Sequence, residues 1–467
     1  ESLMLHACRT GDLKTLIMML VDDASLARRT YRSVLTGQPA HPLAIAIDSG
    51  HMDCAQTLID HQADVNAADQ DGQTPLHIAA ENGLVQCLKQ LITHGANVNA
   101  TNKNGETPLH MANKTGTFEH HQQWTATSRN IYEGFDDYRR MRQHYHSKKE
   151  NDTGCLKELL ANSEVNINAI DNAGVTPLMI AALWGRSEHL KWLLDAGADI
   201  YVTDDLGWTA LHFVALGNCA ESVDVLLVPG IEVSKADNYG WTALHIAAGD
   251  DCAESLKVLL NTPGIRVNKK NGKGLTALHI AAKEDNTDSV KALLVADGIR
   301  INKKSNKGWT ALHTAAKYNS AESVEILLDT PDIRVNKKTT KGWSALHIAA
   351  KYNSTESVKT LLAHPNIRVN KKTDKGWTAL HIAAKYGNIE SAKMLLATVG
   401  ILVNEKVDGK TALHLAAIYG ETECVEALLT TGGILINEQT DDGLTALSLA
   451  TRHGHSACIE LLRAACQ

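Results

Sequence analysis

The 467-residue chain has few aromatic side chains, no long apolar run and no closely spaced cysteines. Aromatic residues make up 4% of the sequence, with only three Phe, whereas hydrophobic residues make up 44% and charged residues 21%. Small side chains must therefore fill most of the core, which favours closely stacked helices and argues against global disorder. The sequence has no run of about 18 apolar residues, the length needed to span a membrane. It begins Glu1-Ser2-Leu3-Met4, without a charged segment followed by an apolar one, as a leader would have.

The nine cysteines are scattered and never form C-x-x-C, which is typical of proteins from a reducing compartment. We therefore expect a cytoplasmic protein, with a nuclear location as the alternative. The sequence also has no G-x-x-x-x-G-K-S/T, no H-E-x-x-H and no G-x-S-x-G. These absences predict a protein that is not an enzyme and uses no cofactor.

What the sequence does have is the tetrapeptide Thr-Pro/Ala-Leu-His, repeated mostly at steps of 33 or 34 residues. Its first residue is found at Thr74, Thr107, Thr176, Thr209, Thr242, Thr276, Thr310, Ser344, Thr378, Thr411 and Thr445. A period of this length with T-P-L-H-x-A is the signature of the ankyrin repeat. The chain therefore resembles the ankyrin-repeat family over nearly its whole length. We number about thirteen repeats, with divergent first units at Leu5-His6-Ala7 and His41-Pro42-Leu43-Ala44.

Each unit can also be interpreted from its residues, as repeat 9 illustrates. Thr310 is a good N-cap for a short helix that opens at residues 311–316, and Asn319-Ser320 breaks that helix. A second helix is expected at 321–328 and is stopped by Pro331. Helices this short need their neighbours for stability. We therefore predict an all-α ankyrin-repeat solenoid of helix-turn-helix units joined by β-turn or hairpin connectors.

One step of 69 residues, between Thr107 and Thr176, interrupts the period. We therefore expect three segments. Residues 1–113 hold repeats 1–3 and the first part of repeat 4, residues 114–150 are a flexible insertion within repeat 4, and residues 151–467 hold the remainder of repeat 4 and repeats 5–13. The insertion contains His120, His121, His144 and His146. No cysteine or acidic residue completes a recognisable ligand spacing with them, so no metal site is predicted.

Histidine is abundant, but ten of the 22 histidines occupy the same place in the repeat. They are His6, His77, His110, His212, His245, His279, His313, His347, His381 and His414. A catalytic group is not usually copied ten times. We interpret these imidazoles as structural groups that bond the capping Thr and nearby backbone, and so tie one turn to the next.

Function is expected on the concave surface, which the ankyrin resemblance assigns to the first helices and the turns before them. The residue between the turn Gly and the Thr is Trp208, Trp241, Trp309, Trp343 or Trp377 in five repeats, which predicts an exposed Trp ladder. Further concave positions hold Lys317-Tyr318, Lys351-Tyr352 and Lys385-Tyr386, and the turns add Lys307, Lys341 and Lys375. Residues 266–385 contain 22 basic and 10 acidic side chains, a net charge of +12 in a chain of net charge −7.

These features predict a protein-interaction scaffold that binds an acidic, phosphorylated or extended partner segment on repeats 8–11 and is monomeric on its own. Three alternatives remain: a nucleic-acid-binding repeat protein, the cytosolic ankyrin region of a larger channel, signalling protein or bacterial effector, and a neutral surface copied by duplication, in which Trp packs on Lys stems. The resemblance also implies possible hydroxylation of Asn66 and Asn99 by asparaginyl hydroxylases.

Overall fold

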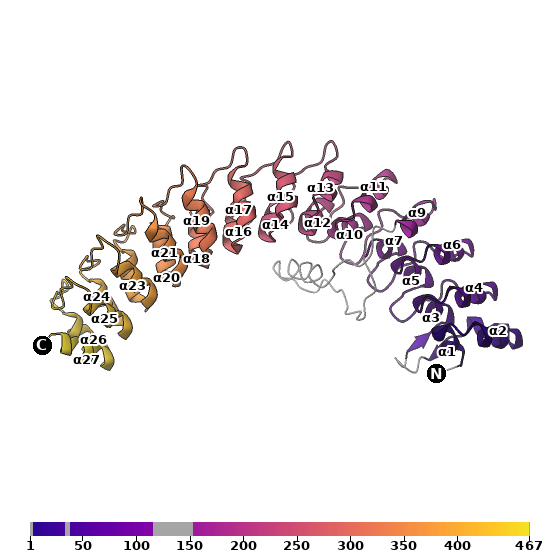
Figure 1. Cartoon of the computed structure of the whole chain (residues 1–467), viewed down its shortest axis with the longest axis horizontal. Coiled ribbons are helices and arrows are strands. Elements are labelled where there is room, and N and C mark those ends of the chain that lie inside the picture. Colours follow the sequence, from indigo (N-terminus) through magenta and orange to yellow (C-terminus); the bar gives the residue numbers. More distant parts are fainter. Residues whose placement is uncertain (1–2, 33–37, 115–152, 467) are drawn as a thin grey trace. The chain divides into compact units, whose positions relative to one another are not determined.

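The computed structural model describes residues 3–32, 38–114 and 153–466 and divides the chain into two compact units, residues 1–239 and 240–467. Unit 1 contains a short antiparallel pair of strands and a series of helices (Figure 1). Its elements are α1 (Leu3–Thr10), α2 (Leu13–Asp22), the 3-10 helix η1 (Ala24–Arg28), β1 (Tyr31–Arg32), β2 (Pro39–Ala40), α3 (Pro42–Asp48), α4 (Met52–Asp60), α5 (Pro75–Glu81), α6 (Val85–Thr93), α7 (Pro108–Ala112), α9 (Gly154–Leu160), α10 (Pro177–Leu183), α11 (Ser187–Asp195), α12 (Ala210–Gly217) and α13 (Ala220–Leu226).

Unit 2 is a stack of helix pairs. Its helices are α14 (Ala243–Gly249), α15 (Ala253–Leu260), α16 (Ala277–Glu284), α17 (Thr287–Leu294), α18 (Ala311–Tyr318), α19 (Ala321–Asp329), α20 (Ala345–Tyr352), α21 (Thr355–Ala363), α22 (Ala379–Lys385), α23 (Ile389–Leu396), α24 (Ala412–Tyr419), α25 (Thr422–Leu429), α26 (Ala446–His453) and α27 (Ser456–Ala465). Within this unit, Figure 1 shows α16, α18 and α20 on the inner side of a curved stack and α17, α19 and α21 on the outer side. The all-α solenoid predicted from the repeat is confirmed.

The start and end of each first helix follow from local hydrogen bonds. In repeat 9, the backbone N–H of Thr310 donates to Nδ1 of His313 (3.2 Å), and the Thr310 hydroxyl lies 2.7 Å from the same nitrogen. Helix α18 ends where Asn319 adopts the left-handed conformation, at φ 59°, which Asn tolerates better than most residues. The helix is therefore two residues longer than the 311–316 opening, and it stops at the predicted Asn319-Ser320 break.

The core lies between the two rows of helices and is made largely of Ala and Leu. In repeat 9, Leu312, Ala315, Ala316, Val324 and Leu327 are each no more than 2% exposed. Within unit 2, each first helix packs against the next first helix, and each second helix against the next second helix. Alanine at the contacts lets neighbouring helices approach closely, which explains how the chain builds a core with so few aromatic residues.

The connectors are β-turns that require glycine at one position. In the turn before Trp309, the N–H of Ser305 donates to the Trp309 carbonyl (2.7 Å), and Gly308 has φ +72°. A Cβ atom on Gly308 would lie 2.5 Å from the backbone nitrogen of Thr340 in the next repeat. Glycine here therefore allows both the turn and the close approach of the next connector.

Asparagine side chains join successive connectors. Nδ2 of Asn302 donates to the Asp332 carbonyl (2.9 Å), and its Oδ1 accepts from the Arg334 backbone N–H (2.9 Å). Asn99 makes the equivalent pair of bonds, to the Glu164 carbonyl and from the Asn166 N–H, each at 2.7 Å. Asn99 lies in the connector that follows repeat 3, and Asn166 lies in the connector that follows the interrupted repeat 4. Repeats 3 and 4 therefore stack as neighbours. Nearly all of the predicted insertion at 114–150, including His120, His121, His144 and His146, lies outside the described residues, so its flexibility and its lack of a metal site stay predictions.

Candidate partner-binding surface

The repeated histidines are structural groups wherever the predicted hydrogen bonds are found. In nine of the ten, Nδ1 accepts from the backbone N–H of the capping Thr or Ser, as in Thr74, Ser344 and Thr411. In repeats 8–10, Nε2 of His279, His313 and His347 bonds the carbonyl of the Trp in the next repeat, at 2.9 to 3.1 Å. The exception is His6, which is exposed and has no Thr three residues before it.

Burial keeps these imidazoles neutral. Burial lowers the pKa of His245, His279, His313 and His347 to about 4. The neutral ring accepts at Nδ1 and donates at Nε2, which matches the two partners of each ring. Among residues 3–32, 38–114 and 153–466, no cluster of three or more His, Cys, Asp or Glu side chains could hold a metal ion.

The five tryptophans predicted to form an exposed ladder are less exposed than expected. Trp208 is 4% exposed, donates from Nε1 to the Asp237 carboxylate (3.1 Å) and packs edge-on against Phe213. The prediction that Trp208 is exposed is therefore wrong, because a carboxylate and a Phe from unit 1 enclose its indole. Sequence position alone missed Asp237, which lies in the next connector. The other four tryptophans, Trp241, Trp309, Trp343 and Trp377, are half-buried.

Among the described residues of unit 2, the exposed aromatic residues are instead tyrosines at the C-terminal ends of the first helices. Tyr318, Tyr352, Tyr386 and Tyr419 are each 46 or 47% exposed. Each belongs to a different repeat of unit 2 and follows its first helix or ends it. Tyr419 extends the predicted Lys-Tyr series by one repeat, although Ile418 replaces lysine there.

Lysine side chains connect the tryptophans and tyrosines of neighbouring repeats. The Lys351 ammonium lies 5.5 Å from the ring of Trp343, 5.4 Å from that of Tyr352 and 5.5 Å from that of Tyr386. The Lys317 ammonium likewise lies 4.4 to 6.0 Å from the rings of Trp309, Tyr318 and Tyr352. The Lys385 ammonium lies 5.0 to 5.8 Å from the rings of Trp377, Tyr386 and Tyr419. Separations of about 6 Å or less are attractive cation–π contacts. We call these residues the lysine–aromatic ladder: Trp309, Lys317, Tyr318, Trp343, Lys351, Tyr352, Trp377, Lys385, Tyr386 and Tyr419.

The ladder carries positive charge without acidic partners. Lys317, Lys351 and Lys385 form no ion pair within the part of the chain that the structure describes. The neighbouring turn residues Lys307, Lys341 and Lys375 are exposed. In repeat 8, by contrast, Lys283 pairs with Glu284.

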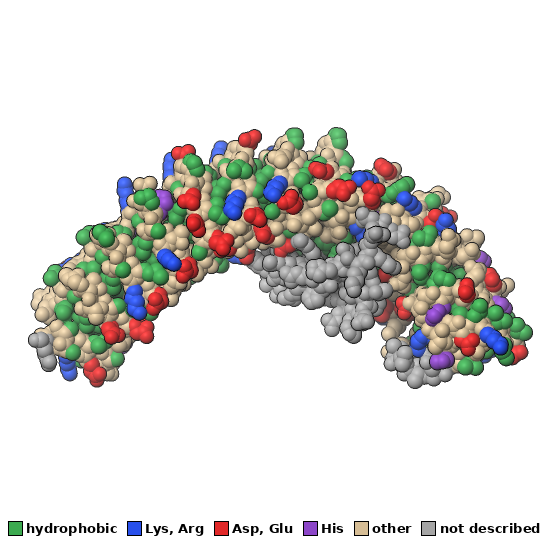
Figure 2. Space-filling view, viewed as in Figure 1, with side chains coloured by type: hydrophobic (Ala, Val, Ile, Leu, Met, Phe, Trp, Pro, Cys, Tyr) green, Lys and Arg blue, Asp and Glu red, His purple; other side chains and the backbone are tan. Residues whose placement is uncertain are grey.

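The second helices of repeats 8, 10 and 11 show the opposite arrangement. Lys291, Lys359 and Lys393 each pair with an acidic side chain three residues earlier. Figure 2 shows Lys, Arg, Asp and Glu side chains interspersed on the visible face of unit 2. The uncompensated charge of the +12 segment is therefore concentrated on the ladder and on the connectors, away from the second helices.

The asparagines predicted as hydroxylation sites also have structural roles. Nδ2 of Asn66 donates to the Gly95 carbonyl (3.1 Å), and its Oδ1 accepts from the Asn97 N–H (2.8 Å). Asn66 is exposed, whereas Asn99 is half-buried. Hydroxylation of either residue stays a prediction.

The architecture and the spacing of these residues agree with the family comparisons. The chain matches models of the ankyrin repeat at residues 43–122, 197–271, 254–339, 330–406 and 397–467, and a further ankyrin-repeat model at 159–214. These matches cover most of the sequence, so the chain belongs to the ankyrin-repeat family. No match was found among curated proteins.

Family membership has a general functional consequence. Ankyrin repeats are generally modules for protein–protein interaction and typically serve as non-enzymatic scaffolds. No helix among the described residues is long and apolar enough to cross a membrane.

Proposed function

We propose that the lysine–aromatic ladder, whose residues lie in repeats 9–12, binds an extended acidic or phosphorylated segment of a partner protein. The observation that carries this proposal is the repeated placement of an ammonium group among three aromatic rings with no acidic side chain paired to it. An incoming carboxylate or phosphate would supply the missing charge. The half-exposed tyrosines would supply rigid contact area, as aromatic residues do at binding hot spots.

The spacing of the ladder suits an extended segment. Packed helices lie about 8–10 Å apart, so ladder lysines of adjacent repeats recur at about that interval. An extended peptide advances about 3.3 Å per residue, which places every third residue near the next lysine. We therefore expect acidic or phosphorylated residues at intervals of about three in the bound segment.

Nucleic acid is a weaker candidate for the same surface. Stacking of bases on aromatic residues requires an open ring face, and here each ladder tryptophan has a lysine ammonium within 6.0 Å of its ring centre. This arrangement favours anionic side chains over bases. Binding of single-stranded DNA at low salt is nevertheless included as an outcome of the test below.

The test compares two variants with equal loss of charge. The ladder variant carries Lys317→Gln, Lys351→Gln and Lys385→Gln, and the matched control carries Lys291→Gln, Lys359→Gln and Lys393→Gln on the second helices. We expect proteins that co-purify with wild type from cell extract to be lost with the ladder variant, retained with the control and released by salt. If both variants retained the same proteins, the proposal would be contradicted. It would also be contradicted if the ladder variant kept its protein partners and lost only the binding of single-stranded DNA at low salt.

A further inference from the structure

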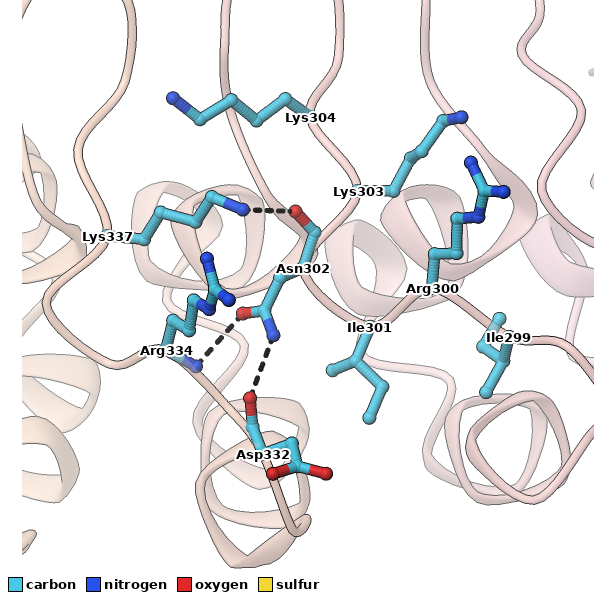
Figure 3. Close-up of a pocket in the computed structure, with 9 residues that line it drawn as sticks. All are labelled: Ile299, Arg300, Ile301, Asn302, Lys303, Lys304, Asp332, Arg334 and Lys337. Atoms are coloured by element: carbon cyan, nitrogen blue, oxygen red, sulfur yellow. Dashed lines mark hydrogen bonds between the residues drawn. The ribbon is translucent and has the colours of Figure 1, made fainter.

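A second positively charged site lies on the connectors of unit 2, formed by chain segments that do not contribute to the lysine–aromatic ladder. It is a pocket of about 630 Å³ between the connector that follows α17 and the one that follows α19 (Figure 3). Its cationic groups are Arg300, Lys303, Lys304, Arg334 and Lys337, and Asp332 is its one acidic lining residue. The volume lies within the range of about 300–1,000 Å³ that is usual for small-molecule sites.

The floor of the pocket is held in place by Asn302. The Asn302 side chain joins the two connectors through the Asp332 carbonyl and the Arg334 backbone N–H (Figure 3). The Asn302 backbone carbonyl accepts a hydrogen bond from Nζ of Lys337 (2.8 Å). These three bonds fix the backbone that carries Arg334 and orient Lys337, so little ordering is needed when a ligand binds.

The positive charges in the pocket are not neutralised by the protein. Within the described residues, Arg300 and Arg334 take part in no ion pair. Figure 3 shows the Arg334 guanidinium directed toward Lys337 and away from the Asp332 carboxylate. Burial, together with repulsion from Arg334 and Lys304, lowers the pKa of Lys337. Arg334 and Lys304 therefore repel Lys337 within the pocket, and a bound anion would relieve this repulsion.

The next repeat shows how the same position can be neutralised. Lys338, the counterpart of Lys304, pairs with Asp374 of the following connector at 3.0 Å. The residue that corresponds to Asp374 for Lys304 is Thr340, which has no charge. Because Thr340 stands where the next repeat has a carboxylate, the positive charge of Lys304 is not neutralised at this position, whereas that of Lys338 is.

The arrangement of the cations indicates the class of ligand. Arg300 and Lys303 are three residues apart on one connector, and Arg334 and Lys337 are three residues apart on the next. Figure 3 shows the two pairs on opposite sides of Asn302. Guanidinium groups bind phosphate through paired hydrogen bonds, with lysine as an added charge. Two such pairs, separated by roughly the 8–10 Å between neighbouring helices, match a ligand with two phosphate groups.

We propose that this pocket binds a small molecule carrying at least two phosphate groups, with Arg300 and Lys303 holding one phosphate and Arg334 and Lys337 another. The side chains of Ile299 and Ile301, which also line the pocket, would contact the body of the ligand. This proposal is independent of partner binding at the ladder.

The test uses the full chain and myo-inositol hexakisphosphate as the probe, titrated by calorimetry at about 0.15 M salt. The site variant carries Arg300→Gln and Arg334→Gln. The matched control carries Lys307→Gln and Lys341→Gln, which remove two charges from exposed turns of the same repeats. We expect saturable binding by wild type and the control, and affinity at least about tenfold weaker for the site variant.

A second measurement does not depend on the variants. Hydrogen–deuterium exchange of wild type should slow at residues 299–304 and 331–337 when the probe is added. Absence of saturable binding, or an equal loss of affinity in both variants, would overturn the proposal. Binding to vesicles that contain a bisphosphorylated inositol lipid, without binding of the soluble probe, would overturn it in favour of a membrane surface.

Discussion

Trp208 in unit 1 and Trp343 in unit 2 occupy the same place in their repeats but have different surroundings. The Trp208 indole is enclosed by Phe213 and bonded to Asp237. Trp343 is half-buried and has the Lys351 ammonium near its ring. The position that Lys351 occupies in repeat 10 is held by Leu216 in repeat 6. One framework position can therefore serve either core packing or a charged surface, and the side chains around it, from its own repeat and the next, decide which.

The largest expected difference between the units is their response to acid. Four histidines of unit 2 have a folded-state pKa of about 4, below the unfolded value of about 6.5. The unfolded chain then binds more protons, so the stability from these groups is present above about pH 6.5 and is lost as the pH falls toward 4. Each shift corresponds to at most roughly 3 kcal/mol.

Unit 1 should lose less stability over the same range. Burial lowers the pKa of His110 to about 4 but raises the pKa of Asp171 to about 6 and that of Asp204 to about 7. A raised aspartate pKa has the opposite sign, because the folded state binds the extra proton and gains stability as the pH falls. Hydrogen exchange at pH 7 and pH 5, corrected for intrinsic rates, should show earlier opening of unit 2. Earlier opening of unit 1 would contradict this assignment.

The second largest expected difference is the loss of stability when each of the two tryptophans is replaced by alanine. We expect Trp208→Ala to lower the free energy of unfolding of unit 1 by about 3–5 kcal/mol, because it creates a cavity and leaves the buried Asp237 carboxylate without its indole partner. Trp343→Ala should cost about 1 kcal/mol, since its ring is already half-exposed. Urea unfolding with exchange detection of each unit measures both values, and equal costs would show that burial does not distinguish the two positions.

Replacement of a network histidine tests the bonds between repeats. Repeat 5 has Met179 in place of histidine, so a methionine side chain fits the site. We expect His347→Met to cost about 2 kcal/mol, because the carbonyl of Trp377 loses its imidazole donor. The N–H of Ser344 keeps an acceptor if the sulfur takes the place of the imidazole, as Met179 Sδ does for the Thr176 N–H at 3.4 Å. The control Met179→Leu should cost less than about 1.5 kcal/mol. Similar costs for the two variants would mean that the imidazole adds only packing.

The smallest predicted effect concerns the ladder itself. Lys351→Leu introduces the residue type of Leu216 from repeat 6 into repeat 10. In a double-mutant cycle with Tyr386→Leu, we expect a coupling energy of about 0.5 kcal/mol, because the contact is partly exposed. A coupling near zero would show that the lysine and tyrosine lie together without attraction.

The fold could be predicted from the sequence because its determinants are local and repeated. Thr310 and His313 are three residues apart, and their bonds define the start of α18. The role of the histidines followed from the same spacing in repeat after repeat. His6 differs because no threonine precedes it at that distance.

The surface was harder to predict because its properties depend on residues of other repeats. Burial of Trp208 depends on Asp237, 29 residues later. The charge of the pocket depends on Thr340, which stands 36 residues after Lys304. The net charge of +12 along residues 266–385 is a sum over the ladder and the connector pocket, and the sequence alone does not divide it between them.

The two bonds of Asn99 have a consequence for how repeat 4 can change. They join connectors whose residues are 65 and 67 positions apart in the chain, as closely as elsewhere in the array. The contact between these connectors is thus kept across a longer separation in sequence than at the other repeat boundaries, where the same pair of asparagine bonds spans about 30 residues. Closing a longer flexible chain between two fixed points costs only about 0.6 kcal/mol more for each doubling of its length, so the stacking of repeats 3 and 4 tolerates a change in the number of residues between them.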